Sequence, residues 1–452
     1  MSLTLVIVII VIVTALVFDF TNGFHDSANA MATSVATGAL SPRVAVLIAA
    51  ILNFVGASMS VEVAKTISSG IVNDALVTPE AVFAGLAGAI IWNLITWLAG
   101  LPSSSSHAMF GGLIGAIVAA AGLAGVHPGV IVSKVLLPAL VAPIVAGVAS
   151  LIATRVAYRV TDHTTQHAAT VFRFGQRISA SMVALAHGTS DGQKTMGVIT
   201  LVLVAGGYQA SGGPEGTRPH EWVIAAAAAA MALGTYSGGW RIMRTMGKRL
   251  VDIQPPQGFA SESAATVAIL ASSHLGFALS TTHVCSGAII GSGVGGRATV
   301  NWSIARRMLY AWLLTLPAAA IVGALASLLT RLGIGGFITV LVLLAGSSLA
   351  ILIAANRNKI GHHNVTADEE PAAAPGMRRF GPGPDRPVSV IDGISWTNAR
   401  DRVSGGIQMT AHAESTNGPG NSGLITIMSD DQDEDEDASD LTDDSHIVPD
   451  GR

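Results

Sequence analysis

No charged side chain occurs between residues 81 and 126 of this chain. Of its 452 residues, 50% are hydrophobic and only 12% are charged, whereas soluble domains average about 25% charged residues. Apolar stretches such as residues 3–18 and 135–152 are long enough, or nearly so, to cross a bilayer as helices. Neither stretch alternates as a barrel strand would, so the sequence predicts an all-α membrane protein with several spans.

Two runs of hydroxyl residues interrupt the apolar sequence. The first follows Pro102 and ends at His107, and the second ends at His283, 176 positions later. Pro102 has no N–H, and a helix begins with free N–H groups, so the first run predicts a break that opens a re-entrant helical hairpin. The second run repeats the pattern and predicts a second hairpin. Hydroxyls at the positive end of a helix dipole form an anion site. The predicted anion-binding residues are Ser104, Ser105, Ser106, Ser280, Thr281 and Thr282.

Simpler explanations exist for both runs. A helix N-cap needs only one hydroxyl, and runs of three or four exceed that need. His107 and His283 are either packing residues or proton-sensitive donors beside the anion. The neighbours Ser106 and His107 point to different faces of a helix and do not form a nucleophile–base pair. The chain is therefore not predicted to be an enzyme.

Two polar clusters, residues 19–29 and 187–194, follow apolar segments that are expected to end there. Each cluster contains an aspartate at the equivalent position, Asp26 or Asp191, and the two lie 165 positions apart. An intramembrane carboxylate is costly unless it is paired, hydrated or functional, although a helix end near the headgroups would also tolerate it. The predicted coupling-ion residues are Asn22, Asp26, Asn29, Asp191 and Gln193. Their oxygen atoms suit a monovalent cation or a proton.

Arginines gather in two connections, near residues 155–177 and 241–249, which the positive-inside rule places in the cytoplasm. The hairpins then enter from opposite sides, so we expect two inverted repeats with broken helices and a substrate site at their interface. The expected units are residues 1–160 and 161–357, with about ten membrane segments in all. Residues 358–452 are rich in Pro, Gly and acid, and are expected to form a disordered cytoplasmic tail.

These motifs resemble the inorganic phosphate transporter family, the Pit-type permeases. Residues 22–30 (NGFHDSANA) are similar to the first family signature, and residues 187–194 (HGTSDGQK) are similar to the second. Residues 101–107 and 279–283 resemble the two hydroxyl loops of the family. The likeness covers most of residues 3–354 and none of the tail. The chain departs from the family at Thr189 and Ser190, where Ala-Asn is common.

The resemblance implies import of inorganic phosphate, free or as a metal–phosphate complex, by symport with H⁺ or Na⁺, of which H⁺ is favoured. The alternatives are another tetrahedral oxyanion, such as sulfate or arsenate, or a phosphate sensor or scaffold that uses the acidic tail. No cofactor, protein-bound metal or nucleic acid is predicted. The expected partners are phosphate, the coupling cation, the lipid bilayer and, as an option, a second copy of the chain. The expected location is the inner (plasma) membrane, with multiple crossings.

Overall fold

The computed structural model describes residues 2–161, 166–213, 216–357 and 360–366, together with four strands between residues 390 and 427. The chain divides into two compact units, Met1–Asp368 and Glu369–Arg452. The helices of the first unit are α1 (Leu3–Ala36), α2 (Pro42–Ala57), α3 (Glu62–Ser69), α4 (Pro79–Leu98), α5 (Ser105–Ala121), α6 (Pro128–Ile131), α7 (Leu137–Val160), α8 (Gln166–Ala205), α9 (Glu221–Ser237), α10 (Trp240–Arg244), α11 (Pro255–His274), α12 (Thr281–Gly295), α13 (Trp302–Thr330) and α14 (Ile334–Asn356). Short 3₁₀-helices are η1 (Asp74–Leu76) and η2 (Leu123–Gly125), and short π-helices are η3 (Val132–Leu136) and η5 (Thr245–Arg249).

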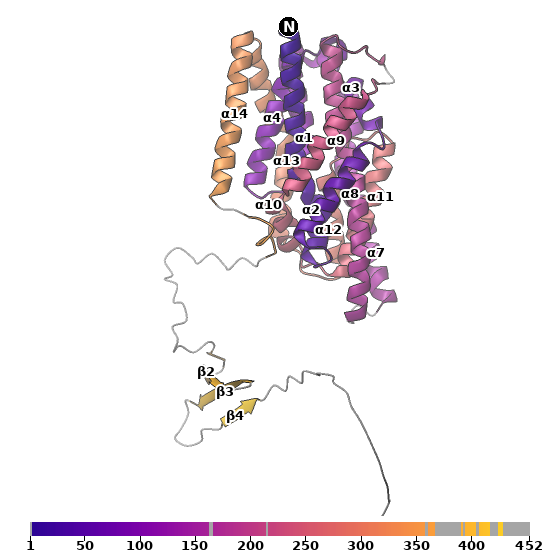
Figure 1. The fold of residues 1–452 in the computed structure, drawn as a ribbon. Coiled ribbons are helices and arrows are strands. Elements are labelled where there is room, and N and C mark those ends of the chain that lie inside the picture. Colours follow the sequence, from indigo (N-terminus) through magenta and orange to yellow (C-terminus); the bar gives the residue numbers. More distant parts are fainter. Residues whose placement is uncertain are drawn as a thin grey trace, which may run out of the picture. The chain divides into compact units, whose positions relative to one another are not determined.

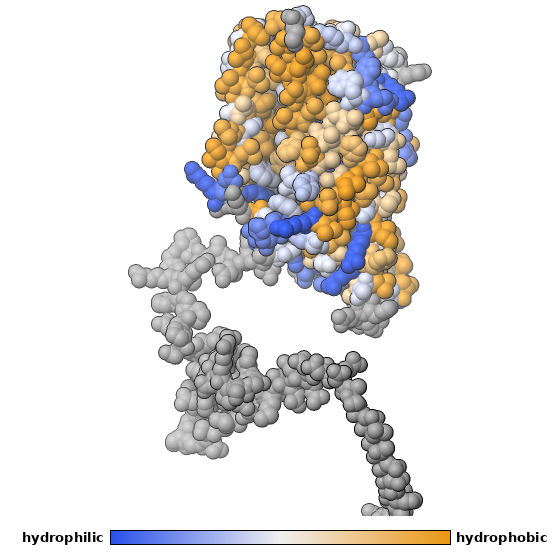
Figure 2. All heavy atoms as spheres, in the orientation of Figure 1, coloured by the Kyte–Doolittle hydropathy of each residue, from blue (hydrophilic) through white to orange (hydrophobic). Residues whose placement is uncertain are grey.

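The first unit is a bundle of long helices (Figure 1), and on the face drawn in Figure 2 apolar residues cover most of its side, with hydrophilic residues toward the two ends. Among its described residues, five helices are long and apolar enough to cross a membrane, and up to seven spans result if each bent pair counts as one. The bent pairs are α2 with α3, at 67°, and α9 with the segment from α10 to η5, at 58°. Outward side chains such as Ile144, Leu313 and Leu349 are exposed and apolar, as lipid contact requires. The predicted all-α membrane fold with broken helices is confirmed.

The prediction that the apolar segments end at the two polar clusters was wrong. Helix α1 continues without a break through the polar cluster at residues 19–29, and α8 does the same at residues 187–194. A helix satisfies its own backbone hydrogen bonds, so polar side chains alone do not end it when neighbouring helices supply their partners. The breaks instead lie between α2 and α3, between α9 and α10, and before α5 and α12.

The two halves repeat the same order of elements and interlock. Helix α1 corresponds to α8, α2 and α3 to α9 and α10, and the α4–α5 hairpin to the α11–α12 hairpin. Helix α7 follows the first hairpin but packs against α11 and α12, whereas α13 follows the second hairpin and packs against α4 and α5. Each half therefore completes the other.

The polar clusters lie at the boundary between two hydrophobic cores. One core contains Phe24 of α1 and Met196 of α8, and the other contains Ala28 of α1 and Ala186 of α8. Asp26 and Asp191 fall between these residues on both helices. Along the chain, α1 passes from the first core to the second, whereas α8 passes from the second to the first. The two helices therefore cross this boundary in opposite directions.

Glycines allow α1 and α8 to approach their neighbours closely. A Cβ atom on Gly23 would collide with the carbonyl oxygen of Met231 in α9, and one on Gly188 with the carbonyl oxygen of Asn53 in α2. The two glycines hold equivalent positions in the repeats, 165 residues apart. The hydrophobic effect does not drive helix association within lipid, so the helices associate by close van der Waals packing, which small residues allow. The crossings hold the polar clusters in place.

The second unit contains four strands, β1 (Val390–Ile391), β2 (Ile394–Val403), β3 (Gly406–Ser415) and β4 (Leu424–Ile427). They pair antiparallel in the order β1-β2-β3-β4. The acidic run at residues 429–437 lies outside the described residues. The disorder expected for residues 358–452 stays a prediction, and within that segment the structure describes this strand pairing.

We expect Gly23→Ala to lower the stability of the protein, because an added methyl group forces α1 away from the α9 backbone. Overpacking of this kind costs about 1–3 kcal/mol. Thermal unfolding in detergent measures the loss. The control is Gly346→Ala in α14, where nothing lies within 4 Å of the added Cβ. Equal unfolding temperatures for the two variants would contradict the close crossing.

Candidate substrate site between the two hairpins

The two hydroxyl runs begin α5 and α12 in the same way. The hydroxyl of Ser104 caps α5 by accepting a hydrogen bond from the His107 N–H at 3.1 Å. The hydroxyl of Ser280 caps α12 by accepting one from the His283 N–H at 3.3 Å. One hydroxyl in each run is therefore a helix cap, and the hydroxyls that follow are free to meet other groups.

Asp26 of α1 connects the two hairpins. Its carboxylate accepts a hydrogen bond from Ser105 of α5 at 2.5 Å and one from Thr282 of α12 at 3.1 Å. The adjacent His25 ring places Nδ1 at 2.7 Å from the same carboxylate. Asp26 is 1% exposed, so these contacts are screened little by solvent. A single carboxylate thus joins side chains that lie far apart in sequence.

The second repeat reproduces these contacts. Thr281, the counterpart of Ser105, donates to Asp191 of α8 at 3.1 Å. Asn29 donates to Thr282 at 3.0 Å, and at the equivalent position, 165 residues later, Lys194 donates to Ser106 at 2.5 Å. The two repeats therefore build one pseudo-symmetric site, but an amide in the first repeat is matched by an ammonium group in the second.

Lys194 supplies the positive charge of the site. Its ammonium group lies 2.5 Å from Asp191 and also donates to the backbone oxygen of Leu279, at 3.0 Å. The side chain is 2% exposed. A buried carboxylate without such a partner is strongly destabilising. Asp191 thus carries its own counter-ion, which the sequence reasoning did not assign.

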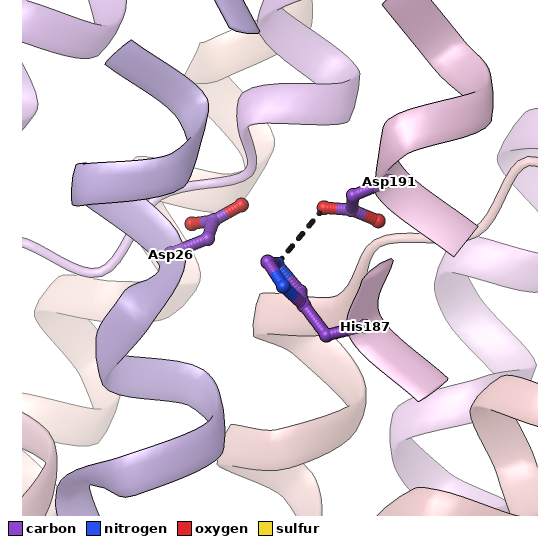
Figure 3. Close-up of side chains that lie close together, drawn as sticks. All are labelled: Asp26, His187 and Asp191. Carbon is purple, nitrogen blue, oxygen red and sulfur yellow. Dashed lines mark ion pairs between the residues drawn. The ribbon is translucent and has the colours of Figure 1, made fainter. Parts of the chain in front are cut away.

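His187 faces both aspartates (Figure 3). Its Nε2 lies 3.3 Å from Asp191, and its Nδ1 lies 3.1 Å from the side-chain oxygen of Asn53. One ligand atom from each of Asp26, His187 and Asp191 lies within 4.8 Å of the others. The three side chains therefore converge on one small buried volume in which a positive charge would be stabilised.

Other predicted site residues take different places. Gln193 accepts from the backbone N–H of Val63 at 2.8 Å, so it holds the start of α3 and is not brought to Asp191. The rings of His107 and His283 meet edge to face, with centroids 4.8 Å apart, and His283 also lies against Trp312. The side-chain oxygen of Asn22 is buried and has no hydrogen-bond partner among the described residues.

Two further buried carboxylates were missed by the sequence reasoning. Glu262 of α11 accepts from Thr33 at 2.6 Å, from Gln176 at 3.2 Å and from Ser179. Asp19 of α1 is fully buried, and neither of its oxygens has a hydrogen-bond partner in the described part of the chain. Glu262 and Asp19 could have been found by the criterion that identified Asp26, which is an acidic residue within an apolar segment.

The sequence profile of the phosphate transporter family matches residues 22–323, which include both aspartates and both hydroxyl runs. The chain belongs to the phosphate transporter family. As a member, it is a multi-pass protein of the bacterial plasma membrane and a transporter rather than an enzyme. The family resemblance inferred from the sequence is confirmed.

Curated relatives include probable low-affinity inorganic phosphate transporters of Mycobacterium tuberculosis and Bacillus subtilis. The first is 51% identical over 374 residues, which is 82% of this chain and 89% of the relative. The second is 41% identical over 329 residues, or 72% and 98%. A solved sodium-dependent phosphate transporter has a TM-score of 0.65 and 24% identity, and the match covers 72% of this chain and 99% of that one. That likeness shows the fold.

We expect Lys194→Met to destabilise this family member, because it leaves the Asp191 carboxylate buried without its cation. Breaking a buried pair in this way costs about 3–5 kcal/mol. Adding Asp191→Asn removes the unpaired charge and should recover most of the loss. Thermal unfolding of the two single variants and the double variant completes the cycle. Purely additive effects would show that the two side chains are not energetically coupled.

Proposed function

We propose that this protein imports inorganic phosphate by symport with H⁺ or Na⁺, and that phosphate binds between the first turns of α5 and α12. The observation that carries the proposal is the meeting of two helix N-termini and their hydroxyls at Asp26, beside the buried ammonium of Lys194. Free N–H groups, hydroxyls and an ammonium group together form a strong set of donors for an oxyanion.

The donors have partners within the protein. Ser105, Thr281 and Thr282 donate to the two aspartates, while Ser106 donates to the Leu279 carbonyl at 3.4 Å. A phosphate entering the site would accept these hydrogen bonds in place of the aspartates. The displaced carboxylates then need positive charge, because two like charges repel in a medium of low dielectric constant. Phosphate and a cation therefore bind best together, which is the basis of symport.

The carboxylates also favour phosphate over sulfate. At neutral pH, phosphate retains at least one proton and can donate a hydrogen bond to Asp26, whereas sulfate has none to donate. A site built to accept a substrate O–H rejects an analogue that lacks it by a factor of about 10⁴–10⁵. Arsenate carries the same protons as phosphate, so we expect it to compete for uptake while sulfate does not.

A metal–phosphate complex is the second candidate cargo. It is favoured by the convergence of Asp26, His187 and Asp191, which offers oxygen and nitrogen ligands to a divalent ion. Lys194 opposes it, because its ammonium group already neutralises Asp191. We therefore take free phosphate as the cargo. Uptake of labelled phosphate that continues in a chelator, without Mg²⁺, supports this choice, and a strict need for Mg²⁺ would contradict it.

The sensor alternative makes a different prediction for the tail. If the protein is a transporter, a chain that ends after Asp368 retains the whole helical unit and both hairpins. We expect its phosphate uptake in proteoliposomes to match that of the full chain at equal protein density. A truncated protein that reaches the membrane but does not transport would favour a working role for residues 369–452.

Removing one hydroxyl from each repeat tests the shared phosphate site. A hydrogen bond to a charged group contributes about 1.5–3 kcal/mol, so Ser106→Ala or Thr282→Ala should weaken apparent phosphate affinity roughly ten- to a hundredfold. Uptake of labelled phosphate measures this, with pH and sodium gradients imposed separately. The control is Ser292→Ala, whose buried hydroxyl donates only to Ile289 of its own helix. Normal affinity in both test variants would exclude a shared site.

A further inference from the structure

Asp19 is a fully buried carboxylate whose oxygens form no ion pair among the described residues. Asp26 has the His25 ring and two hydroxyl donors, and Asp191 has Lys194. Asp19 is fully buried like them, but among the described residues no donor meets the geometry of a hydrogen bond to either of its oxygens. A bare carboxylate is not stable in such an environment and must take up positive charge from outside.

The neighbours of Asp19 supply further oxygens. Asn22, one turn along α1, and Thr195 of α8 are neighbouring polar side chains that favour a negative charge on the Asp19 carboxylate. Both side chains are buried, and Asn22 Oδ1 and Thr195 Oγ1 have no hydrogen-bond partner in the described structure. Two helices therefore present four unpartnered oxygen atoms within one buried region. Carboxylate, amide and hydroxyl oxygens are the ligands of hard cations.

The charged groups that act on Asp19 come from α8. They are Asp191, which disfavours a negative charge at Asp19, and Lys194, which favours it. Across the described residues of the other helices packed on α1, including α4 and α9, no further charged side chain acts on it. Because Lys194 is already in contact with Asp191, the Asp19–Asp191–Lys194 group carries one negative charge when both carboxylates are ionised.

We propose that the coupling cation binds at Asp19, Asn22 and Thr195. The ligand is a single positive charge, supplied either as Na⁺ or as a proton on the Asp19 carboxylate. Seven residues of helix separate Asp19 from Asp26, or about 10 Å along the axis. The cation site is therefore separate from the phosphate site, where Lys194 contacts Asp191 and Ser106. This inference rests on the proposed phosphate symport.

The test is Asp19→Asn, which keeps the shape of the side chain and removes its charge. In proteoliposomes, wild type concentrates labelled phosphate under the gradient that drives it. The variant should exchange phosphate across the membrane at a rate near that of wild type but should not concentrate it. One arm imposes a pH gradient without sodium, and the other a sodium gradient at equal pH. The arm that drives wild type and fails in the variant identifies the cation.

A second substitution addresses the ligands. Thr195→Val removes one oxygen at nearly constant volume and should raise the half-saturating concentration of the driving cation about tenfold, as expected for the loss of one contact to a charged group. The control is Thr200→Val on the same helix, whose buried hydroxyl donates to Met196 of that helix at 2.8 Å. It should leave cation dependence unchanged.

Three results would overturn the proposal. An Asp19→Asn protein that still concentrates phosphate shows that the coupling charge binds elsewhere. A folded Asp19→Asn protein that has lost exchange as well shows that Asp19 belongs to the substrate site. Equal cation dependence in Thr195→Val and Thr200→Val removes Thr195 from the site. Failure of phosphate symport itself is a different outcome, since wild type would then show no phosphate uptake in either arm.

Discussion

Buried charge in a medium of low dielectric constant is the constraint on which the rest of this structure depends. Asp26 is tolerated because α5 and α12 both send hydroxyls to it, and Asp191 because Lys194 lies within hydrogen-bonding distance. These contacts position the two hairpins, since an uncompensated carboxylate inside the membrane would be strongly destabilising.

The helix crossings place these charges. Gly23 and Gly188 let α1 and α8 lie against the backbones of α9 and α2, so the polar clusters face inward and not toward lipid. The exchange of α7 and α13 between the halves then ties each hairpin to the opposite repeat. Relative movement of the repeats therefore changes the contacts of both hairpins at once, which suits a carrier that exposes one site alternately to the two sides of the membrane.

The repeats are not equivalent in charge. The position that holds Asn29 in the first repeat holds Lys194 in the second, and both side chains donate to a hydroxyl of the opposite hairpin. The first repeat therefore places a neutral amide where the second repeat places a positive charge.

The sequence by itself determined the membrane class and indicated the two hairpins and the two aspartates that the structure brings together. Apolar length, the duplicated hydroxyl runs and the isolated aspartates are local properties, and the 165-residue and 176-residue offsets link them without coordinates. Only the tertiary structure decided which polar residue meets which. Gln193 belongs to the second signature but accepts a hydrogen bond from the start of α3. The surroundings of Asp19 and Lys194 include residues of other helices, Thr195 of α8 and Ser106 of α5 respectively. Pairing of buried charges depends on distances of a few ångströms between distant segments, and periodicity along one chain does not contain those distances.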